Sequence, residues 1–335
     1  MNKKDLGLLV LIVIVGLVVY LRNPAFLGPQ NLANTANLIG LFGLFAIAQG
    51  FVIITGGIDL SAGSMIALLG TLFVDLVGNK GVPWPIAFAI VLVLGLILGL
   101  THGLLITRLK MQPFVVTLCG LLIYRGVARG YTADATAGFP FGSEYPGLDF
   151  FVARIGGVPV SVYVLAVVAV IAWFTLHRSV FGRYLYAIGK NEEAARFSGI
   201  RTGAVVTAAY VIAAGLTALA AVFFAMYTRS VQPSSQGNFY ELYAIAAAVL
   251  GGFSLRGGEG SIVGVILGTI LLQELQNLVN LLGIPSSLNF AVMGGVILIG
   301  VLVDQQWNAF RARRRIIEAA RAPAPAATTI SEANG

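Results

Sequence analysis

Charged residues are scarce in this sequence of 335 residues, since Asp, Glu, Lys and Arg together make up only 10% of it. An ordinary soluble domain carries roughly 25%. Hydrophobic residues make up 58% and gather in long continuous runs, such as 84–107 and 204–227, rather than in the short alternating segments of a membrane β-barrel. This composition excludes a soluble globule and predicts an all-α polytopic membrane protein.

Histidine and cysteine are almost absent, because the sequence has only His102, His177 and Cys119. An H-E-x-x-H motif, a paired-Cys spacing and an intrachain disulfide are therefore excluded, and we expect no metal site and no cofactor in this chain. A nucleotide-binding P-loop is missing as well, because Gly189-Lys190-Asn191 lacks the Ser or Thr and the upstream Gly of that motif. Without catalytic groups, the sequence predicts a transporter rather than an enzyme.

Hydropathy, interrupted by Gly, Pro and charged residues, predicts about ten transmembrane helices in a single transmembrane domain, residues 1–303. The expected spans are 6–21, 31–54, 60–77, 84–107, 113–131, 158–176, 204–227, 241–255, 260–282 and 287–303. The link at 55–59 is too short and Gly-rich for an ordinary loop, which suggests a helix break at membrane depth. Residues 304–335 are expected to form a basic cytoplasmic tail that is disordered at its end.

Basic residues outnumber acidic ones by 21 to 14. In a membrane protein this excess first reports topology, and we expect no nucleic-acid partner. With ten spans and a cytoplasmic N-terminus, 15 of the 21 basic residues fall on the inside. The sequence thus predicts both termini in the cytoplasm, an external connection at 132–157 and the longest internal loop at 177–203.

Polar residues follow the expected helix break. Asp59 and Ser61 are typical of the start of a new helix, and Ser64 lies in its first turn. The free N–H groups of such a helix are satisfied either by Asp59 itself or by a polar solute. Capping by Asp59 is the favoured interpretation, and a place in the translocation path for these three residues is the alternative.

A polar stripe runs along the expected span 260–282. Gln273, Asn277 and Asn280 recur at helical spacing, so they share one face that cannot contact lipid cheaply. Uncharged amides that line a water-filled path would suit a neutral, hydroxyl-rich solute. Hydrogen bonding between helices explains the stripe equally well. In contrast, Gly95, Gly99 and Gly103 recur at every fourth position and predict close helix packing.

Two stretches of the sequence resemble each other weakly. Ala46-Ile47-Ala48 precedes a Gly-rich segment with Asp59, and Ala244-Ile245-Ala246 precedes one with Glu259. Paired broken segments in the two halves of a chain indicate a transport pathway. Since the sequence is rich in Ala, Gly and Leu, duplication and chance similarity both remain open.

The internal loop carries the most specific pattern in the sequence. A short helix is expected after Asn191, with acidic residues in its first turn and Gly at its end. Apolar and aromatic side chains in this loop, among them Phe197, favour contact with a partner or a membrane surface over a solvated loop. The pattern comprises Gly182, Arg183, Glu192, Glu193, Ala194, Ala195 and Gly199.

Three segments of the sequence resemble a known family. Its members are the membrane-spanning permeases of bacterial ABC importers for monosaccharides of the ribose, xylose, arabinose and galactoside type. Segment 56–64 is similar to a hallmark of that family, with Ala62 in place of its usual Val. Segment 182–199 is similar to its cytoplasmic coupling loop with the E-A-A-x-x-x-G pattern, and 250–261 is a third match. The resemblance extends over about residues 31–303.

The resemblance implies the ABC importer permease fold in the bacterial plasma (inner) membrane and alternating access driven by a separate ATPase. It implies an ABC ATPase subunit as a partner, contacted by the seven pattern residues of the internal loop. It also implies a periplasmic or lipid-anchored sugar-binding protein, a second permease copy and the membrane lipid. The expected substrate is a ribose-like pentose or related sugar. The alternatives are an ABC permease for another small solute, such as a sugar-derived signal, a nucleoside or an amino acid, and an ion-coupled secondary transporter.

Overall fold

A computed structural model describes residues 3–140, 145–285 and a few isolated positions up to 298. The chain divides into two units, Met1–Met293 and Gly294–Gly335, and the following description concerns the first. The expected boundary at residue 303, the span 287–303 and the tail 304–335 lie outside the residues that the structure describes as continuous chain.

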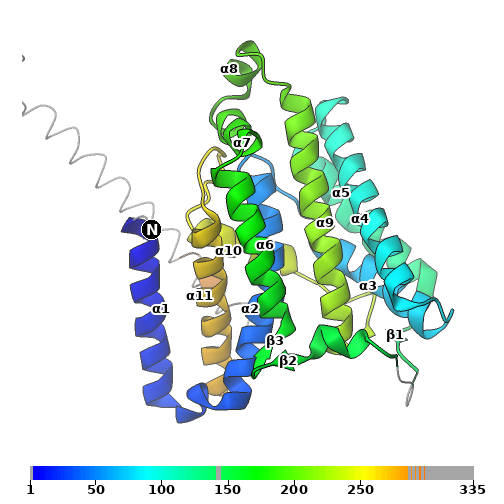
Figure 1. Cartoon of the computed structure of the whole chain (residues 1–335), viewed down its shortest axis with the longest axis vertical. Coiled ribbons are helices and arrows are strands. Elements are labelled where there is room, and N and C mark those ends of the chain that lie inside the picture. The colour runs from blue at the N-terminus through cyan, green and yellow to red at the C-terminus, as the bar shows by residue number, and fades with distance from the viewer. Residues whose placement is uncertain are drawn as a thin grey trace, which may run out of the picture. The chain divides into compact units, whose positions relative to one another are not determined.

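Helices dominate the described part of the chain (Figure 1). They are α1 Lys3–Arg22, α2 Pro29–Ile53, α3 Ala62–Gly78, α4 Trp84–Thr107, α5 Pro113–Thr132, α6 Val160–His177, α7 Val180–Lys190, α8 Glu192–Phe197, α9 Thr202–Thr228, α10 Tyr240–Leu250 and α11 Ile262–Leu281, with 3-10 turns at Pro24–Leu27 and Leu148–Val152. Within the described residues, seven of these helices are long and apolar enough to cross a membrane: α1, α2, α4, α5, α6, α9 and α11. The prediction of an all-α polytopic membrane protein is confirmed.

Two expected spans are shorter than a crossing helix requires. At 1.5 Å per residue, the 17 residues of α3 extend about 26 Å and the 11 residues of α10 about 16 Å, against a hydrocarbon core of about 30 Å. The helix in the expected span 241–255 ends early, at Leu250.

Small residues set the spacing of the central helices. A side chain at Gly95, Gly99 or Gly103 of α4 would come within 2.6–2.7 Å of Ala218, Ala214 or Thr207 of α9, which is closer than packed side chains approach. The prediction that this glycine stripe mediates close packing is confirmed. Large side chains fill the core around it, with Phe45, Phe73 and Tyr210 at most 1% exposed.

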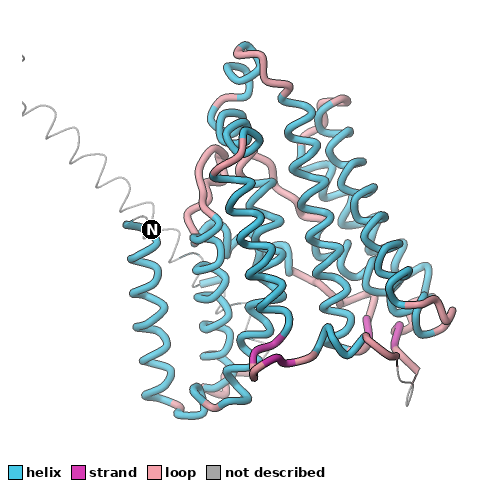
Figure 2. The backbone as a smooth tube through the Cα atoms, in the orientation of Figure 1, coloured by secondary structure: helices cyan, strands magenta, loops and turns pink. Residues whose placement is uncertain are grey.

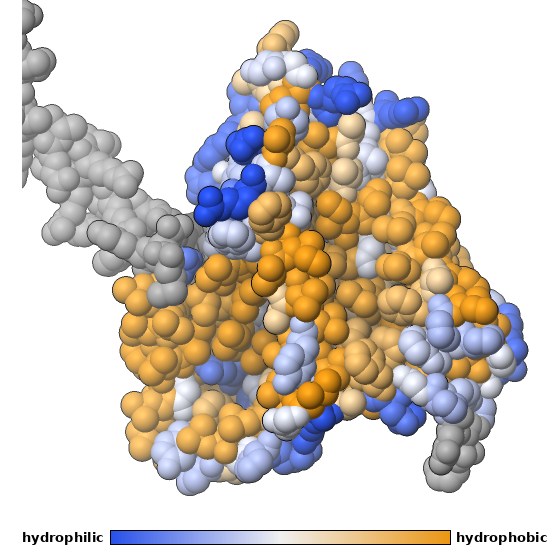
Figure 3. All heavy atoms as spheres, viewed as in Figure 1, coloured by the Kyte–Doolittle hydropathy of each residue, from blue (hydrophilic) through white to orange (hydrophobic). Residues whose placement is uncertain are grey.

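The two ends of the helical unit differ in structure. α7 and α8 lie at one end, and the strands of the described residues lie at the other (Figures 1 and 2). Hydrophilic residues gather at both ends, and a hydrophobic zone lies between them (Figure 3). This is the distribution expected of a protein whose middle lies in hydrocarbon.

Four short strands, which the sequence did not predict, form two pairs that involve the 132–157 connection. β1 (Ala137–Gly138) pairs antiparallel with β4 (Ser230–Val231), and Ala137 lies opposite Val231. β2 (Arg154–Ile155) pairs with β3 (Val158–Pro159). The first pair ties the connection after α5 to the segment after α9, although the two are far apart in the sequence.

Candidate functional site

The break between α2 and α3 is buried and held together by Asp59. Asp59 is 4% exposed, and its Oδ1 accepts hydrogen bonds from the backbone N–H of Ser61 at 2.8 Å and from Ser61 Oγ at 2.6 Å. Its backbone oxygen accepts from Gln49 Nε2 at 2.7 Å. Asp59 therefore fixes the backbone just before α3 through Ser61, which is the N-cap residue. The side chain of Ser61 makes no capping bond, and the hydrogen bonds of Asp59 do not reach the first-turn N–H groups of α3, so the capping interpretation is wrong in its detail.

Further polar side chains are buried beside the break. Ser64 Oγ donates to the backbone oxygen of Ser61 at 2.8 Å. His102 of α4 is 2% exposed, and its Nε2 lies 2.7 Å from the hydroxyl of Tyr124 of α5. The break is thus enclosed by α4 and α5 as well as by α2, and Thr117 of α5 donates to the backbone oxygen of Ile58. Three buried polar atoms around it have no hydrogen-bond partner among the described residues: Gln49 Oε1, His102 Nδ1 and the hydroxyl of Tyr210.

A second non-helical segment, 232–239, leads into the helical unit from the strand end. Tyr240, the first residue of α10, packs against Phe42 in a tilted arrangement with ring centroids 4.8 Å apart. Phe42 lies next to the middle residue of the 25-residue α2. α10 therefore begins at middle depth, and residues 232–239 form a re-entrant segment, which a membrane tolerates only where its backbone groups are bonded.

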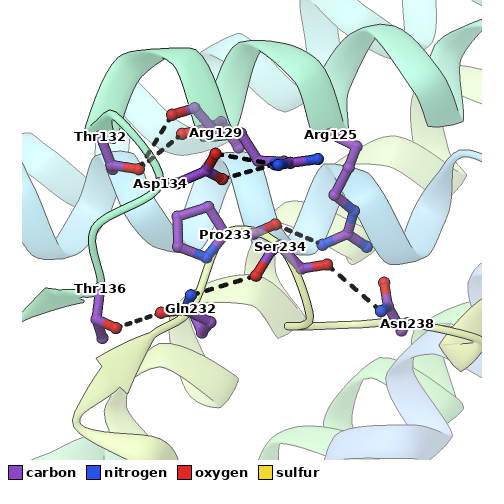
Figure 4. A network of polar contacts seen from close by, with 10 residues as sticks. Arg125, Arg129, Thr132, Asp134, Thr136, Gln232, Pro233, Ser234 and Asn238 are labelled. Atoms are coloured by element: carbon purple, nitrogen blue, oxygen red, sulfur yellow. Dashed lines mark hydrogen bonds and ion pairs between the residues drawn. The ribbon is translucent and has the colours of Figure 1, made fainter.

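Turn hydrogen bonds within the segment satisfy part of its backbone, and Arg125 of α5 bonds two more of its carbonyl oxygens (Figure 4). Its Nη1 donates to the backbone oxygens of Pro233 at 2.8 Å and Gln236 at 2.7 Å. Because guanidinium hydrogen bonds are charge-assisted, they are the stronger kind for holding carbonyl groups away from water. At the mouth of the segment, Thr136 donates to Gln232, which adds to the strand pairing.

The re-entrant segment touches the first turn of α3. A side chain at Gly63 would overlap the carboxylate of Glu241 and the backbone oxygen of Gly237, so the two backbones meet with no room between them. Glu241 is 6% exposed, and its carboxylate lies at a helix N-terminus, where negative charge is favourable. Asp59, Ser61, Ser64, Glu241 and the segment 232–239 thus form one candidate site, which we call the α3 site.

The stripe on α11 lies elsewhere. Asn277 Nδ2 donates to Asn31 Oδ1 at 2.9 Å and to the hydroxyl of Thr35, both on α2. Gln273 is buried, and Asn280 is exposed. In the described part of the chain no hydrogen bond joins this stripe to the α3 site. Asn277 fits the interpretation of hydrogen bonding between helices, and a place for the stripe in the path stays a prediction.

We expect Asn277→Leu to lower the stability of the protein, because it removes the bonds to α2. Hydrogen bonds between membrane helices contribute about 0.6 kcal/mol on average and at most about 1.7 kcal/mol. Thermal unfolding of the detergent-solubilised protein measures the effect. Asn280→Leu, on the same stripe but exposed, is the matched control and should unfold at the wild-type temperature; equal loss in both variants would contradict the pairing with α2.

The predicted coupling loop folds into α7 and α8. Asn191 Oδ1 accepts from the N–H of Ala194 at 2.9 Å, and Gly199 has a φ of +85°, so α8 begins and ends as predicted. Phe197 is 84% exposed at its tip. Ala195 is buried, Gly182 is buried against the end of α6, and the other residues predicted to contact a partner are exposed: Arg183, Glu192, Glu193, Ala194 and Gly199.

Sequence reasoning missed Arg125, Glu241 and the re-entrant segment. Two signals were available: charges inside apolar runs, which are rare in membrane helices and mark function, and the polar run 232–238 before the shortest expected span. Neither signal says that Arg125 and residues 233 and 236, more than 100 positions apart, meet. That pairing depends on the packing of α5 beside the chain that follows α9.

Comparison with known proteins places this geometry in a family. Residues 31–302 match the family described as branched-chain amino acid transport system / permease component. The ribose import permease protein RbsC of Bacillus subtilis (strain 168) is 41% identical over 91% of this chain and 92% of its own. RbsC of Escherichia coli (strain K12) is 39% identical (91% and 94%), and its xylose transport system permease protein XylH is 30% identical (90% and 93%).

No solved structure matches the chain significantly. The family match covers the helix break, the coupling loop and the re-entrant segment, which are the features that the geometry singles out. The apolar helices and the matched relatives together make this a multi-pass inner-membrane protein. The chain belongs to the family of membrane-embedded permease components of transport systems that includes the ribose and xylose permeases.

Proposed function

We propose that this chain is the permease subunit of an ABC importer that carries ribose or a similar pentose across the bacterial inner membrane. The similarity to ribose import permeases over nine tenths of both chains carries the proposal. The α3 site supports it, since its hydroxyl, amide and carboxylate groups suit a neutral solute with many hydroxyl groups.

The energy would come from a separate ATPase subunit that docks on α7 and α8, with both chain termini on the same cytoplasmic side. The exposed Phe197 and the acidic first turn of α8 support docking there, because an exposed aromatic tip is typical of an interface anchor. A sugar-binding protein would deliver the solute at the strand end. A second permease copy, either identical or related, and the surrounding lipid would complete the assembly, and this chain itself would need no cofactor.

Reconstitution in liposomes tests the proposal. The permease, its ATPase and its binding protein should together accumulate labelled ribose when ATP is supplied, and omission of the ATPase should abolish uptake. Labelled xylose, leucine and a nucleoside serve as competing solutes, since the family description names branched-chain amino acids. ATP-driven uptake of another solute without ribose uptake would overturn the substrate assignment, and uptake by the isolated chain down an ion gradient would indicate a secondary transporter.

We expect Glu193→Lys to uncouple ATP hydrolysis from uptake while the permease remains inserted. Glu193 is exposed in the first turn of α8, where a positive charge opposes the helix dipole and changes the surface that meets the ATPase. Gly199→Pro should act similarly, because proline cannot adopt a φ of +85°. The measurement is sugar imported per ATP hydrolysed; an unchanged ratio in both variants would contradict docking at α8.

A further inference from the structure

The C-terminal end of α7 meets two non-helical segments at a single point: the break between α2 and α3, and the loop 251–261 between α10 and α11. We call these two segments the helix breaks. The backbone N–H of Gly258, in the loop 251–261 before α11, donates to the oxygen of Ile54 at the end of α2 at 2.8 Å. A side chain at Gly189 of α7 would overlap both groups. Three backbones therefore touch here, and we call this contact of Gly189, Ile54 and Gly258 the α7 junction.

Two side chains bond α7 to the loop 251–261. The hydroxyl of Tyr186 donates to the backbone oxygen of Gly260 at 2.8 Å and lies 3.2 Å from Nδ1 of His177. Nε2 of His177 accepts from the N–H of Ile262, the first residue of α11, at 3.3 Å. Because Nε2 accepts, the neutral ring carries its proton on Nδ1, which donates to Tyr186. Burial raises the pKa of Tyr186 to about 12, so its hydroxyl keeps the proton that it donates.

An ion pair lies beside the α7 junction and joins α7 to the loop 251–261. Lys190 Nζ lies 2.5 Å from Glu259 Oε1, and both side chains are more than half exposed. An exposed pair contributes at most about 1 kcal/mol, so its role is to fix the alignment of α7 with the loop rather than to hold the fold. Glu259, the counterpart of Asp59 in the weak sequence repeat, therefore lies in an environment unlike that of the buried Asp59.

α8 is joined directly to this arrangement. Asn191 ends α7, where its N–H donates to the oxygen of Ala187, and its side chain caps the start of α8. No flexible linker separates the two helices. A displacement of α8 therefore reaches α7 without being absorbed by a loop.

We propose that α7 and the loop 251–261 move as one body, with Tyr186 as the positioning residue, so that displacement of α8 reaches the helix breaks on both sides of the α7 junction. This inference rests on the proposed function, since the docked ATPase would supply the displacement. It goes further, because it assigns the transmission of movement to particular hydrogen bonds outside the docking surface.

Removal of one hydroxyl tests the role of Tyr186. Tyr186→Phe keeps the ring but loses the bond to Gly260, and we expect sugar imported per ATP hydrolysed to fall roughly two- to tenfold while assembly with the ATPase is unchanged. Tyr184→Phe, on the same helix but exposed, is the matched control and should keep the wild-type ratio. A wild-type ratio in Tyr186→Phe would overturn the proposal.

A chemical bridge tests whether the segments move together. In a Cys119→Ser background, which has no other cysteine, Lys190→Cys and Glu259→Cys can be joined by a short bismaleimide. We expect the bridged protein to transport at the rate of its unbridged form. Arrest on bridging would show that the segments separate during transport and would overturn the proposal. If the wild-type complex imports no sugar, the proposed function itself fails, so the two failures are distinguishable.

Discussion

Arg125→Met is expected to abolish transport. Arg125 donates to the backbone oxygens of Pro233 and Gln236, and methionine fills similar space without a donor. Hydrogen bonds to a charged group contribute about 1.5–3 kcal/mol each, so two of them shift an equilibrium between the ordered and displaced re-entrant segment more than a hundredfold. Sugar uptake by reconstituted liposomes is the measurement.

Arg129→Met is the matched control for this variant. Arg129 lies four residues further along α5, is exposed, and pairs with Asp134 at 2.6 Å (Figure 4). The pKa of Asp134 is lowered by this hydrogen-bonded guanidinium, yet an exposed pair of this kind has little effect on stability. Arg129→Met should therefore transport normally, and Arg125→Lys should retain part of the activity, since it keeps the charge but has fewer donors. Normal uptake by Arg125→Met would rule out the anchoring role.

Gly189→Ala should also stop transport, through a steric effect rather than through charge. Its new methyl group would overlap the backbone of Ile54 and of Gly258, and backbone atoms cannot rotate out of the way as a flexible side chain can. Overpacking of this kind costs about 1–3 kcal/mol or more, enough to displace α7 from both helix breaks. The measurements are sugar uptake and the ATP hydrolysed per sugar.

Gly203→Ala separates this steric effect from the general effect of alanine in a helix. A side chain at Gly203 of α9 would lie 3.5 Å from Thr107, an ordinary contact, and alanine favours a helix by about 1 kcal/mol relative to glycine. We expect Gly203→Ala to transport as the wild type does. If Gly189→Ala does so too, the contact of the three backbones has no part in transport.

Local signals in the sequence were sufficient for the helices and their ends. Nine of the ten expected spans coincide with helices in the described part of the chain, since long apolar runs have few other stable conformations in lipid. The start of α8 at Asn191 and its end before Gly199 were predicted by capping chemistry that acts over four residues. At the start of α3 the same chemistry did not act as predicted, because Asp59 bonds to Ser61 before the helix and not to the N–H groups of its first turn.

Features that depend on distant parts of the chain were not predicted. α10 is shorter than a full span because the re-entrant segment precedes it, and Arg125 bonds two backbone oxygens of that segment from a distant helix. Sequence left two interpretations of Asn277 equally open, and the tertiary structure placed its amide on α2. The amide of Asn277 can make the same hydrogen bonds in both interpretations. Only the residues that lie beside it distinguish the two.

The sequence by itself determined that this chain is an α-helical membrane transporter, where its helices break, and where a partner is expected to dock. These properties follow from apolar content, from charge distribution and from capping residues that act on their immediate neighbours. Only the tertiary structure decided that the two helix breaks meet at Gly189 and that Arg125 holds the re-entrant segment. Those contacts join residues more than 60 positions apart, and the packing of whole helices brings them together.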